Sequence, residues 1–210
     1  MPQIDTKDRL LEAAERLFAS EGLSRTSLRA ITCAAGVNVA AVHYHFGSKD
    51  ELLVELLRRR IAPLNEERLT RLQAIEVDAN GGPLPLEPVL RAFVEPAFRF
   101  RSEISSRGQL GRLFGRLYAE PEEILESTLR EIFEDVAQRF RVAFGRALPH
   151  LPEADLDWRF HFLIGVVVHT LMGRRDTHAP SAPASPESEI IDRVIAFTAA
   201  GLRAPVEVGP

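Results

Sequence analysis

The chain has 210 residues, of which 45% are hydrophobic, so it is long enough to bury a sizeable core, and disorder as a whole is excluded. Its 26 basic and 30 acidic side chains give a net charge of −4. A generally basic nucleic-acid coat is therefore excluded, and any site for a polyanion must be a local patch.

Hydrophobic residues recur at helical spacing along nearly the whole chain, and no run alternates with the period of two that is typical of a strand. The sequence therefore predicts an all-α fold. Gly22 and Gly36 are left-handed stops for the first two helices, and Asn38 is an N-cap for the third. Ser48 and Glu51 have the spacing of a capping box that opens a much longer helix. The first helix is predicted to run from about residue 5 to residue 20, and the second begins after Thr26 or Ser27, both good caps. The third runs from its Asn38 cap to about residue 45, and the fourth from residue 48 towards residue 72.

Two glycines and two prolines break the helical pattern between Val77 and Leu86. We expect this stretch to be a linker between the N-terminal part and the rest. Three prolines predict a loop at 176–186. The helices predicted beyond the linker cover residues 86–101, 105–118, 122–148, 153–172 and 187–202.

Several features predict a cytoplasmic protein. The longest strongly apolar run without a charge, residues 160–173, has 14 residues. Because a bilayer span needs about 20, we expect no membrane helix. The first residues lack the charged and then apolar pattern of a signal peptide. Cys33 is the only cysteine and cannot form an intramolecular disulfide, so we expect it to be a small core residue.

Charge is distributed unevenly along the chain. Residues 1–60 carry nine basic and eight acidic side chains, whereas residues 61–210 carry seventeen and twenty-two. No acidic residue occurs between Glu21 and Asp50. The same window holds the basic residues Arg25, Arg29, His43, His45 and Lys49. It is the part of the chain where we expect a polyanion to bind.

Two short helices joined by a turn at Gly36, with an amphipathic helix before them, are typical of a helix-turn-helix unit. The second short helix would read DNA. At 100° per residue, Val42 and Phe46 point to the core beside Val39. The residues that point outward are Ala40, Ala41 and Tyr44, flanked by His43 and His45. Such a face suits a major groove, where an alanine methyl meets a thymine methyl and Tyr or His reaches phosphates.

Lys49 gives an independent indication, because a cation in the first turn of a helix opposes the macrodipole at a cost of ~0.3–1 kcal/mol. We expect a phosphate at that helix N-terminus to offset this cost. Arg29 and the hydroxyls of Thr26 and Ser27 would hold the neighbouring DNA backbone. Val39 completes the set of predicted DNA-binding residues.

Several side chains allow two interpretations. Residues 58–60 are three arginines that could clamp a phosphate or form a solvated helix face. His161 and His169 lie on nearly one helix face, where they would pack at an interface or touch a ligand. His43 and His45 point about 200° apart, so they cannot share a metal.

The runs Leu23–Ile31, Ala34–Asn38 and His43–Leu53 resemble the DNA-binding domain of the TetR family of bacterial transcriptional regulators. The resemblance covers residues 8–60. The family commonly has a tyrosine or similar aromatic residue where His43 stands, and many members have larger residues than the Ala40–Ala41 pair. Residues 38–46 are similar to a subset that includes regulators of fatty-acid metabolism.

The resemblance implies a helix-turn-helix DNA-binding domain at residues 1–50, with the connecting helix at 48–72. Residues 51–210 would then form a larger helical domain for ligand binding and dimerisation. A dimer doubles the base contacts of one short reader helix and predicts a palindromic operator.

Two apolar stripes at helical spacing predict a four-helix dimer interface. One stripe consists of Leu156, Phe160, Leu163, Val167 and Leu171, and the other of Ile191, Val194, Ile195, Thr198 and Leu202. Gly165 and Gly201 would allow close approach of the helices.

Ten of the twelve phenylalanines lie beyond residue 90, which predicts an apolar cavity for a hydrophobic small molecule. Arg112, Arg116 and His169 are candidate polar anchors in it. The predicted ligand-binding residues are Phe93, Phe98, Leu110, Phe114, Leu117, Phe133, Phe140 and His169.

The leading hypothesis is a dimeric repressor that a hydrophobic ligand releases from double-stranded DNA. The alternative is a helical small-molecule carrier or a protein–protein adaptor. The sequence has no nucleophile with a paired base, no set of metal ligands and no phosphate-binding glycine loop, so we expect neither an enzyme nor a cofactor.

Overall fold

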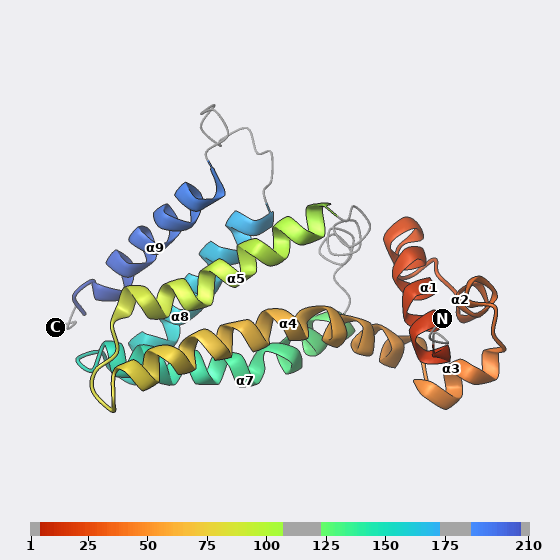
Figure 1. Cartoon of the computed structure of the whole chain (residues 1–210), viewed down its shortest axis with the longest axis horizontal. Coiled ribbons are helices and arrows are strands. Elements are labelled where there is room, and N and C mark those ends of the chain that lie inside the picture. Colours follow the sequence, from red (N-terminus) through yellow and green to blue (C-terminus); the bar gives the residue numbers. More distant parts are fainter. Residues whose placement is uncertain (1–4, 107–122, 173–185, 207–210) are drawn as a thin grey trace. The chain divides into compact units, whose positions relative to one another are not determined.

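A computed structural model describes residues 5–106, 123–172 and 186–206, and these residues are helical with short connections (Figure 1). No strand occurs in these ranges, so the predicted all-α fold is confirmed. The chain forms two compact units. The first comprises residues 1–63 and 102–133, and the second comprises residues 64–101 and 134–210.

The first unit opens with three helices, α1 (Thr6–Glu21), α2 (Leu28–Ala35) and α3 (Val39–His45). Each helix contacts the other two. Ser27 caps α2 by accepting a hydrogen bond from the Ala30 N–H at 3.1 Å, and Asn38 caps α3 by accepting one from the Ala40 N–H. Gly36 ends α2 in the left-handed conformation, with φ +64°. These caps confirm the predicted helix-turn-helix unit.

Arg9 on α1 fixes the turn between the two short helices. Its guanidinium donates hydrogen bonds to the carbonyl oxygens of Ala35 at 2.5 Å and Gly36 at 3.1 Å. A cation at the C-terminal end of α2 also stabilises the helix dipole. A side chain at position 36 would meet this guanidinium, since a Cβ atom there would lie 2.9 Å from it. Glycine is therefore favoured here by its backbone conformation, and a larger residue would also displace the Arg9 guanidinium.

The long helix α4 (Lys49–Asp78) begins with Ser48 as its N-cap, which accepts a hydrogen bond from the Glu51 N–H at 3.1 Å. The helix contains Pro63, which removes one backbone hydrogen bond. The two compact units divide directly after this proline. The helix also extends past the predicted end at Leu72.

The connection after α4 is a short turn at residues 79–85, with Asn80 and Gly81 at positive φ. It leads into α5 (Leu86–Ser106). Both flanking segments belong to the second unit. The expected linker between the N-terminal part and the rest was therefore wrong in its role, because glycine and proline mark a turn without saying what it joins.

The second unit also contains most of α7 (Glu123–Ala147), together with α8 (Glu153–Met172) and α9 (Glu187–Arg203). α5 continues through the break predicted after residue 101. The helix predicted at 105–118 lies almost wholly outside the described residues, as does the loop predicted at 176–186.

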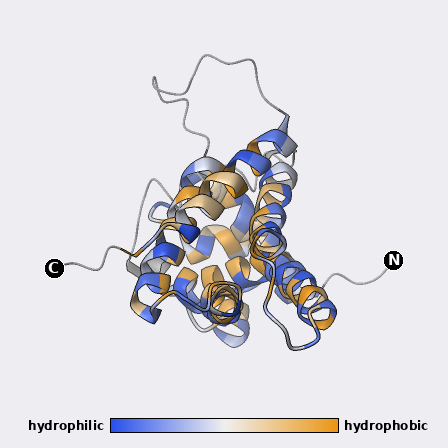
Figure 2. Ribbon diagram, turned by 90° about the vertical axis from the view of Figure 1, so that its left-hand side faces the viewer, coloured by the Kyte–Doolittle hydropathy of each residue, from blue (hydrophilic) through white to orange (hydrophobic). Residues whose placement is uncertain are grey.

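The helices are amphipathic, and their apolar faces form the cores (Figure 2). The core of the second unit contains five buried phenylalanines, and four of them, Phe93, Phe140, Phe144 and Phe160, form one cluster of neighbouring rings from three helices. Neighbouring ring centroids are 5.0–6.3 Å apart. Ring pairs at such distances stabilise a core beyond the area they bury.

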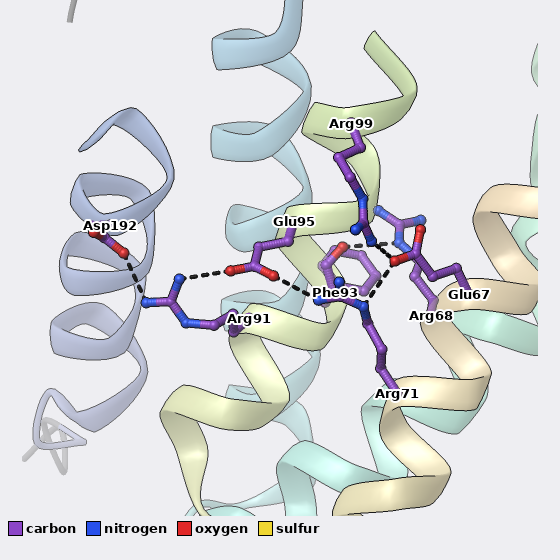
Figure 3. Close-up of polar contacts among 8 residues, drawn as sticks. All are labelled: Glu67, Arg68, Arg71, Arg91, Phe93, Glu95, Arg99 and Asp192. Carbon is purple, nitrogen blue, oxygen red and sulfur yellow. Dashed lines mark hydrogen bonds and ion pairs between the residues drawn. The ribbon is translucent and has the colours of Figure 1, made fainter. Parts of the chain in front are cut away.

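A chain of alternating charges joins α4, α5 and α9 within the second unit (Figure 3). Glu95 accepts hydrogen bonds from Arg71 at 2.6 Å and from Arg91 at 2.7 Å. Arg91 also donates to Asp192 on α9 at 2.8 Å. Burial alone would raise the pKa of Glu95, but the hydrogen bonds from Arg91 and Arg71 lower it below its ordinary value.

Arg68 on α4 is buried beside Phe93 of α5 (Figure 3). Its Nε atom donates to the Phe93 carbonyl oxygen at 2.9 Å, and its guanidinium carbon lies 4.1 Å from the centroid of the Phe93 ring. Burial lowers the pKa of Arg68 to about 10. Arg68 on α4 thus contacts both the backbone carbonyl and the aromatic ring of Phe93 on α5.

Candidate nucleic-acid interface

The outer face of α3 is open to solvent. Tyr44 is 86% exposed, and Ala40 is also exposed, whereas Val42 and Phe46 are buried. Ala41 is half-buried. Val39 is 37% exposed, so it does not lie in the core beside Val42 and Phe46, and its exposure agrees with its place among the predicted DNA-binding residues. The exposed face therefore consists of small apolar side chains and one aromatic hydroxyl.

Two histidines flank this face. His43 is exposed, and its Nδ1 atom lies 2.8 Å from the Gly47 carbonyl oxygen. His45 is half-buried, and its ring meets the Tyr44 ring edge-on, with centroids 5.1 Å apart. The end of α3 thus presents one exposed imidazole and one exposed phenol to solvent.

The residues at the start of α2 have different roles. Ser27 and Arg29 are exposed there, as a phosphate contact requires. Thr26 is buried, and its hydroxyl donates to the Gly22 carbonyl oxygen at 2.7 Å. The predicted contact between the Thr26 hydroxyl and DNA is therefore wrong, because the hydroxyl is occupied inside the protein.

Lys49 does not point away from the protein at the start of α4. Its ammonium group donates hydrogen bonds to the carbonyl oxygens of Leu23 at 3.0 Å and Thr26 at 3.4 Å. These carbonyls offset the unfavourable dipole contact that had predicted a phosphate. The oxygen partners of Lys49 are thus carbonyl groups of the protein itself, where a phosphate was predicted.

The three arginines at residues 58–60 form ion pairs within the first unit. Arg58 pairs with Glu131 at 2.8 Å, Arg59 with Asp8 at 2.5 Å, and Arg60 with Glu15. This arrangement matches the interpretation of the arginines as a helix face and offers no phosphate clamp.

A hollow of about 340 Å³ lies in the first unit next to these pairs. Charged side chains line it, among them Lys7, Glu51, Glu55 and Arg58, together with His45. Lys7 donates to Glu55 at 2.6 Å and lowers the pKa of that carboxyl group. The hollow is therefore polar, in contrast to the apolar cavity that the phenylalanines predict.

The two apolar stripes predicted for the dimer interface are directed into the protomer. Nine of their ten residues are buried within the single chain, and Leu171 is half-buried. A surface already covered by its own chain is not available to a second copy, so these residues were wrongly assigned. The periodicity correctly identified the buried face, but it does not say which chain covers that face.

A different face of α8 and α9 carries exposed aromatic residues, and the sequence interpretation missed them. Trp158 is 64%, Phe162 59% and Phe197 68% exposed. The rings of Trp158 and Phe162 lie next to each other on α8, with centroids 5.9 Å apart and planes tilted by 31°. α8 and α9 contact each other. The spacing of Trp158 and Phe162, four residues apart, was the available signal for a second apolar face.

The predicted ligand-binding residues fall into three groups. Phe93, Phe98 and Phe140 are buried in the second unit, and Phe133 is half-buried in the first. His169 is exposed, so its expected position as an anchor inside a cavity was wrong. The others, Leu110, Phe114, Leu117, Arg112 and Arg116, lie outside the described residues.

Three further observations concern metals, cysteine and membranes. Cys33 is exposed on α2, contrary to the expected core position. Among the described residues, no three His, Cys, Asp or Glu side chains are grouped to hold a metal ion. In the same ranges, no helix combines the length and the apolar character needed to cross a bilayer.

The fold and the site define a helix-turn-helix protein with a second, all-helical unit. Residues 10–56 match the family described as bacterial regulatory proteins, tetR family. Residues 91–201 match the family described as tetracyclin repressor-like, C-terminal domain. The second match alone covers more than half of the chain, so this chain belongs to the TetR family of bacterial transcriptional regulators.

Named relatives share mainly the N-terminal part. The transcriptional regulator TtgR of Pseudomonas putida is 43% identical over 53 residues, which are 25% of each chain. The transcriptional repressor AcnR of Corynebacterium efficiens is 26% identical over 132 residues, which cover 60% of this chain and 63% of AcnR. The matches thus span from a quarter to less than two thirds of these relatives.

Solved structures share the whole fold. The fatty acid degradation regulator FadR of Bacillus halodurans has a TM-score of 0.62 and 15% identity, with 98% of this chain and 100% of FadR covered. A TetR-family regulator of Streptomyces coelicolor has a TM-score of 0.60 and 22% identity, with 95% of both chains covered. At these identities the likeness shows the fold alone.

Proposed function

We propose that this regulator is a cytoplasmic, dimeric repressor that binds a palindromic operator and leaves it when a hydrophobic small molecule binds the second unit. The observation that supports this most is the outer face of α3. Ala40 and Tyr44 are exposed on it, next to a stretch of chain without acidic residues. Small apolar side chains gain nothing from exposure to water, whereas in a major groove they can contact thymine methyl groups.

The DNA contacts divide into two kinds. Ala40 and Ala41 would meet base edges, mainly thymine methyl groups, while Tyr44, Ser27 and Arg29 would hold phosphates. Two methyl groups offer no hydrogen bonds to bases, so sequence discrimination would depend in part on DNA shape. Repressors among the relatives, such as AcnR, agree with the proposed direction of regulation.

A second copy of the chain would cover the outer face of α8 and α9. Trp158, Phe162 and Phe197 expose large apolar surface there. Gly165 on α8 and Gly201 on α9 have no atom of the described residues within 4 Å of the place where a Cβ would stand. Packing within the protomer therefore does not require glycine at these two positions. Close approach of the backbone of a partner chain would explain why glycine stands there.

The effector would bind among the aromatic side chains of the second unit and act through α4. This helix begins beside α3 and continues into the second unit beyond Pro63. An effector that prefers one arrangement of α4 shifts the spacing of the two reader helices, and the strength of the effect equals its difference in affinity for the two arrangements.

Selection from a random double-stranded DNA library, followed by footprinting, tests the proposal. We expect enrichment of a palindrome whose half-sites lie about one helical turn, or a multiple of it, apart. Affinity should fall steeply with salt because bound phosphates release counterions. Failure to enrich any sequence, combined with salt-independent binding, would contradict the proposed function.

A further inference from the structure

The imidazole of His43 has a defined tautomer in the free protein. Its Nδ1 atom lies 2.8 Å from the Gly47 carbonyl oxygen. A carbonyl oxygen only accepts hydrogen bonds, so Nδ1 must carry the proton that is donated. Gly47 is itself held at the end of α3, because its N–H donates to the Val42 and His43 carbonyl oxygens at 3.1 and 3.2 Å. The acceptor of the His43 proton is therefore fixed in place.

This tautomer determines what the other ring nitrogen can do. In the neutral ring, Nε2 then has a lone pair and no proton. A phosphate oxygen is also an acceptor, so the neutral ring cannot donate to DNA without giving up its bond to Gly47. After protonation both nitrogens donate, one to Gly47 and one to a phosphate. Since His43 is exposed beside Tyr44 on the proposed DNA-binding face, such a contact is sterically open.

The charged groups around the end of α3 are engaged elsewhere. Lys49 donates to Leu23 and Thr26, while Arg25 donates to the Glu21 carbonyl oxygen at 2.9 Å. The Glu51 carboxylate accepts a hydrogen bond from the Ser48 hydroxyl at 3.4 Å, and the Glu51 N–H donates to the Ser48 hydroxyl oxygen at 3.1 Å.

Four other polar groups lie on α3 or on the neighbouring helices α2 and α4. Asp50 on α4 and Arg29 on α2 are exposed. Tyr44 is the exposed neighbour of His43 on α3. His45, which lines the polar hollow, is the other imidazole on α3, and it therefore serves as the control.

We propose that DNA binding by this regulator takes up a proton at His43, so that acidification strengthens its hold on the operator. The proposal rests on the proposed function, since it needs DNA at α3. Binding forms one new charge-assisted hydrogen bond, from the protonated Nε2 to a phosphate oxygen, and the proton comes from the solvent. Imidazole titrates between pH 5 and 8, so the effect falls in a physiological range.

The experiment measures the affinity of the full-length protein for a 30-base-pair duplex recovered by selection at pH 7. Fluorescence anisotropy titrations at pH 6, 7 and 8 and constant ionic strength compare wild type with His43→Tyr, His43→Phe and the control His45→Gln. Each linked proton changes affinity by at most about tenfold per pH unit. We expect the wild type to bind roughly tenfold more tightly or better at pH 6 than at pH 8.

The variants separate the pH effect from the contact itself. His43→Tyr can still donate to phosphate, so it should bind with nearly the same affinity at every pH. His43→Phe should bind more weakly and also lose the pH dependence, whereas His45→Gln should retain it. A pH dependence that persists in both His43 variants would overturn the proposal.

Imidazole ¹⁵N chemical shifts at pH 7 provide a second readout that does not depend on affinity. The free protein should show a proton on Nδ1 of His43, and the DNA complex should show both nitrogens protonated. A neutral His43 ring in the complex would overturn the proposal while leaving the proposed function intact. Failure of the wild type to bind any duplex would overturn the proposed function and this proposal with it.

Discussion

The ammonium nitrogen of Lys49 lies 3.0 Å from the carbonyl oxygen of Leu23, so the first residue of α4 is tied to the loop that precedes α2. Lys49→Met should remove this tie. We expect the free energy of unfolding to fall by about 1–2 kcal/mol, because hydrogen bonds from charged groups contribute in that range. DNA affinity should fall as well, because α2 and α3 lose a fixed position.

The salt dependence of DNA binding distinguishes an internal hydrogen bond of Lys49 from a contact between Lys49 and a phosphate. The slope of log affinity against log salt should be the same in Lys49→Met and wild type, since no phosphate contact is lost. Arg29→Met is the matched comparison, because Arg29 is exposed on α2. It should leave stability unchanged and reduce the slope by about one. A reduced slope in Lys49→Met would instead assign Lys49 to phosphate.

Tyr44→Phe tests the aromatic hydroxyl on the outer face of α3. Because Tyr44 is 86% exposed, its hydroxyl contributes little to folding, and the melting temperature should remain within about one degree. Loss of a hydrogen bond to phosphate should weaken operator binding by about tenfold, or ~1.4 kcal/mol. Anisotropy titration measures the affinity, and Val142→Ala, which changes an exposed side chain of α7, is the control. Equal affinity of Tyr44→Phe and wild type would remove Tyr44 from the interface.

The helices were predictable because their signals are local. The caps at Asn38 and Ser48 and the glycine at position 36 act within one turn of the chain, and each one was found where the sequence placed it. Ser27 is the cap among the two candidates, Thr26 and Ser27, that the sequence offered for α2. The C-terminal ends of α4 and α5 were not predicted correctly, because tertiary packing extends helices past weak local stop signals.

The sites were predictable only in part, because sequence periodicity identifies a buried face without identifying its neighbour. Ala40 and Tyr44 lie on an exposed face as expected. Lys49 donates to a backbone carbonyl 26 residues away along the chain, and Thr26 donates to one four residues away. No pattern of side chains in the sequence encodes these backbone partners. For the same reason, the stripe containing Leu163 was assigned to a second chain although its own protomer covers it.

The exposed aromatic face of α8 and α9 gives a direct prediction for assembly. The double substitution Trp158→Glu and Phe162→Glu should convert the proposed dimer to a monomer, because burial of two carboxylates in an apolar interface is strongly unfavourable. Sedimentation velocity measures the change in mass. The helical content should remain that of wild type, since both side chains are more than half exposed in the protomer.

Two controls make this prediction specific. Val142→Glu places a charge on α7, at a residue that is 51% exposed, and it should leave the mass unchanged. Leu163→Ala truncates a buried residue of the stripe, and it should lower the free energy of unfolding by about 2–5 kcal/mol. A mass that is unaffected by the double substitution would place the interface elsewhere.

Glu95 predicts how the second unit responds to acid. Hydrogen bonds from Arg91 and Arg71 outweigh burial and hold the pKa of Glu95 below its ordinary value of 4.5. The unfolded chain therefore binds more protons than the folded one as the pH falls through that value, so the stability that Glu95 contributes is present above it and is lost below it. Glu95→Gln should be less stable at pH 6 by about 1–2 kcal/mol, and its stability should fall less between pH 6 and pH 3.5 than that of wild type.

Urea unfolding followed by circular dichroism checks both expectations. The protein concentration is kept constant, because the stability of a dimer depends on it. Glu134→Gln alters an exposed carboxylate on α7 and should retain the wild-type difference between the two pH values. If Glu95→Gln loses as much stability on acidification as wild type does, the charge chain from α4 to α9 contributes nothing to the pH response, and other carboxylates must account for it.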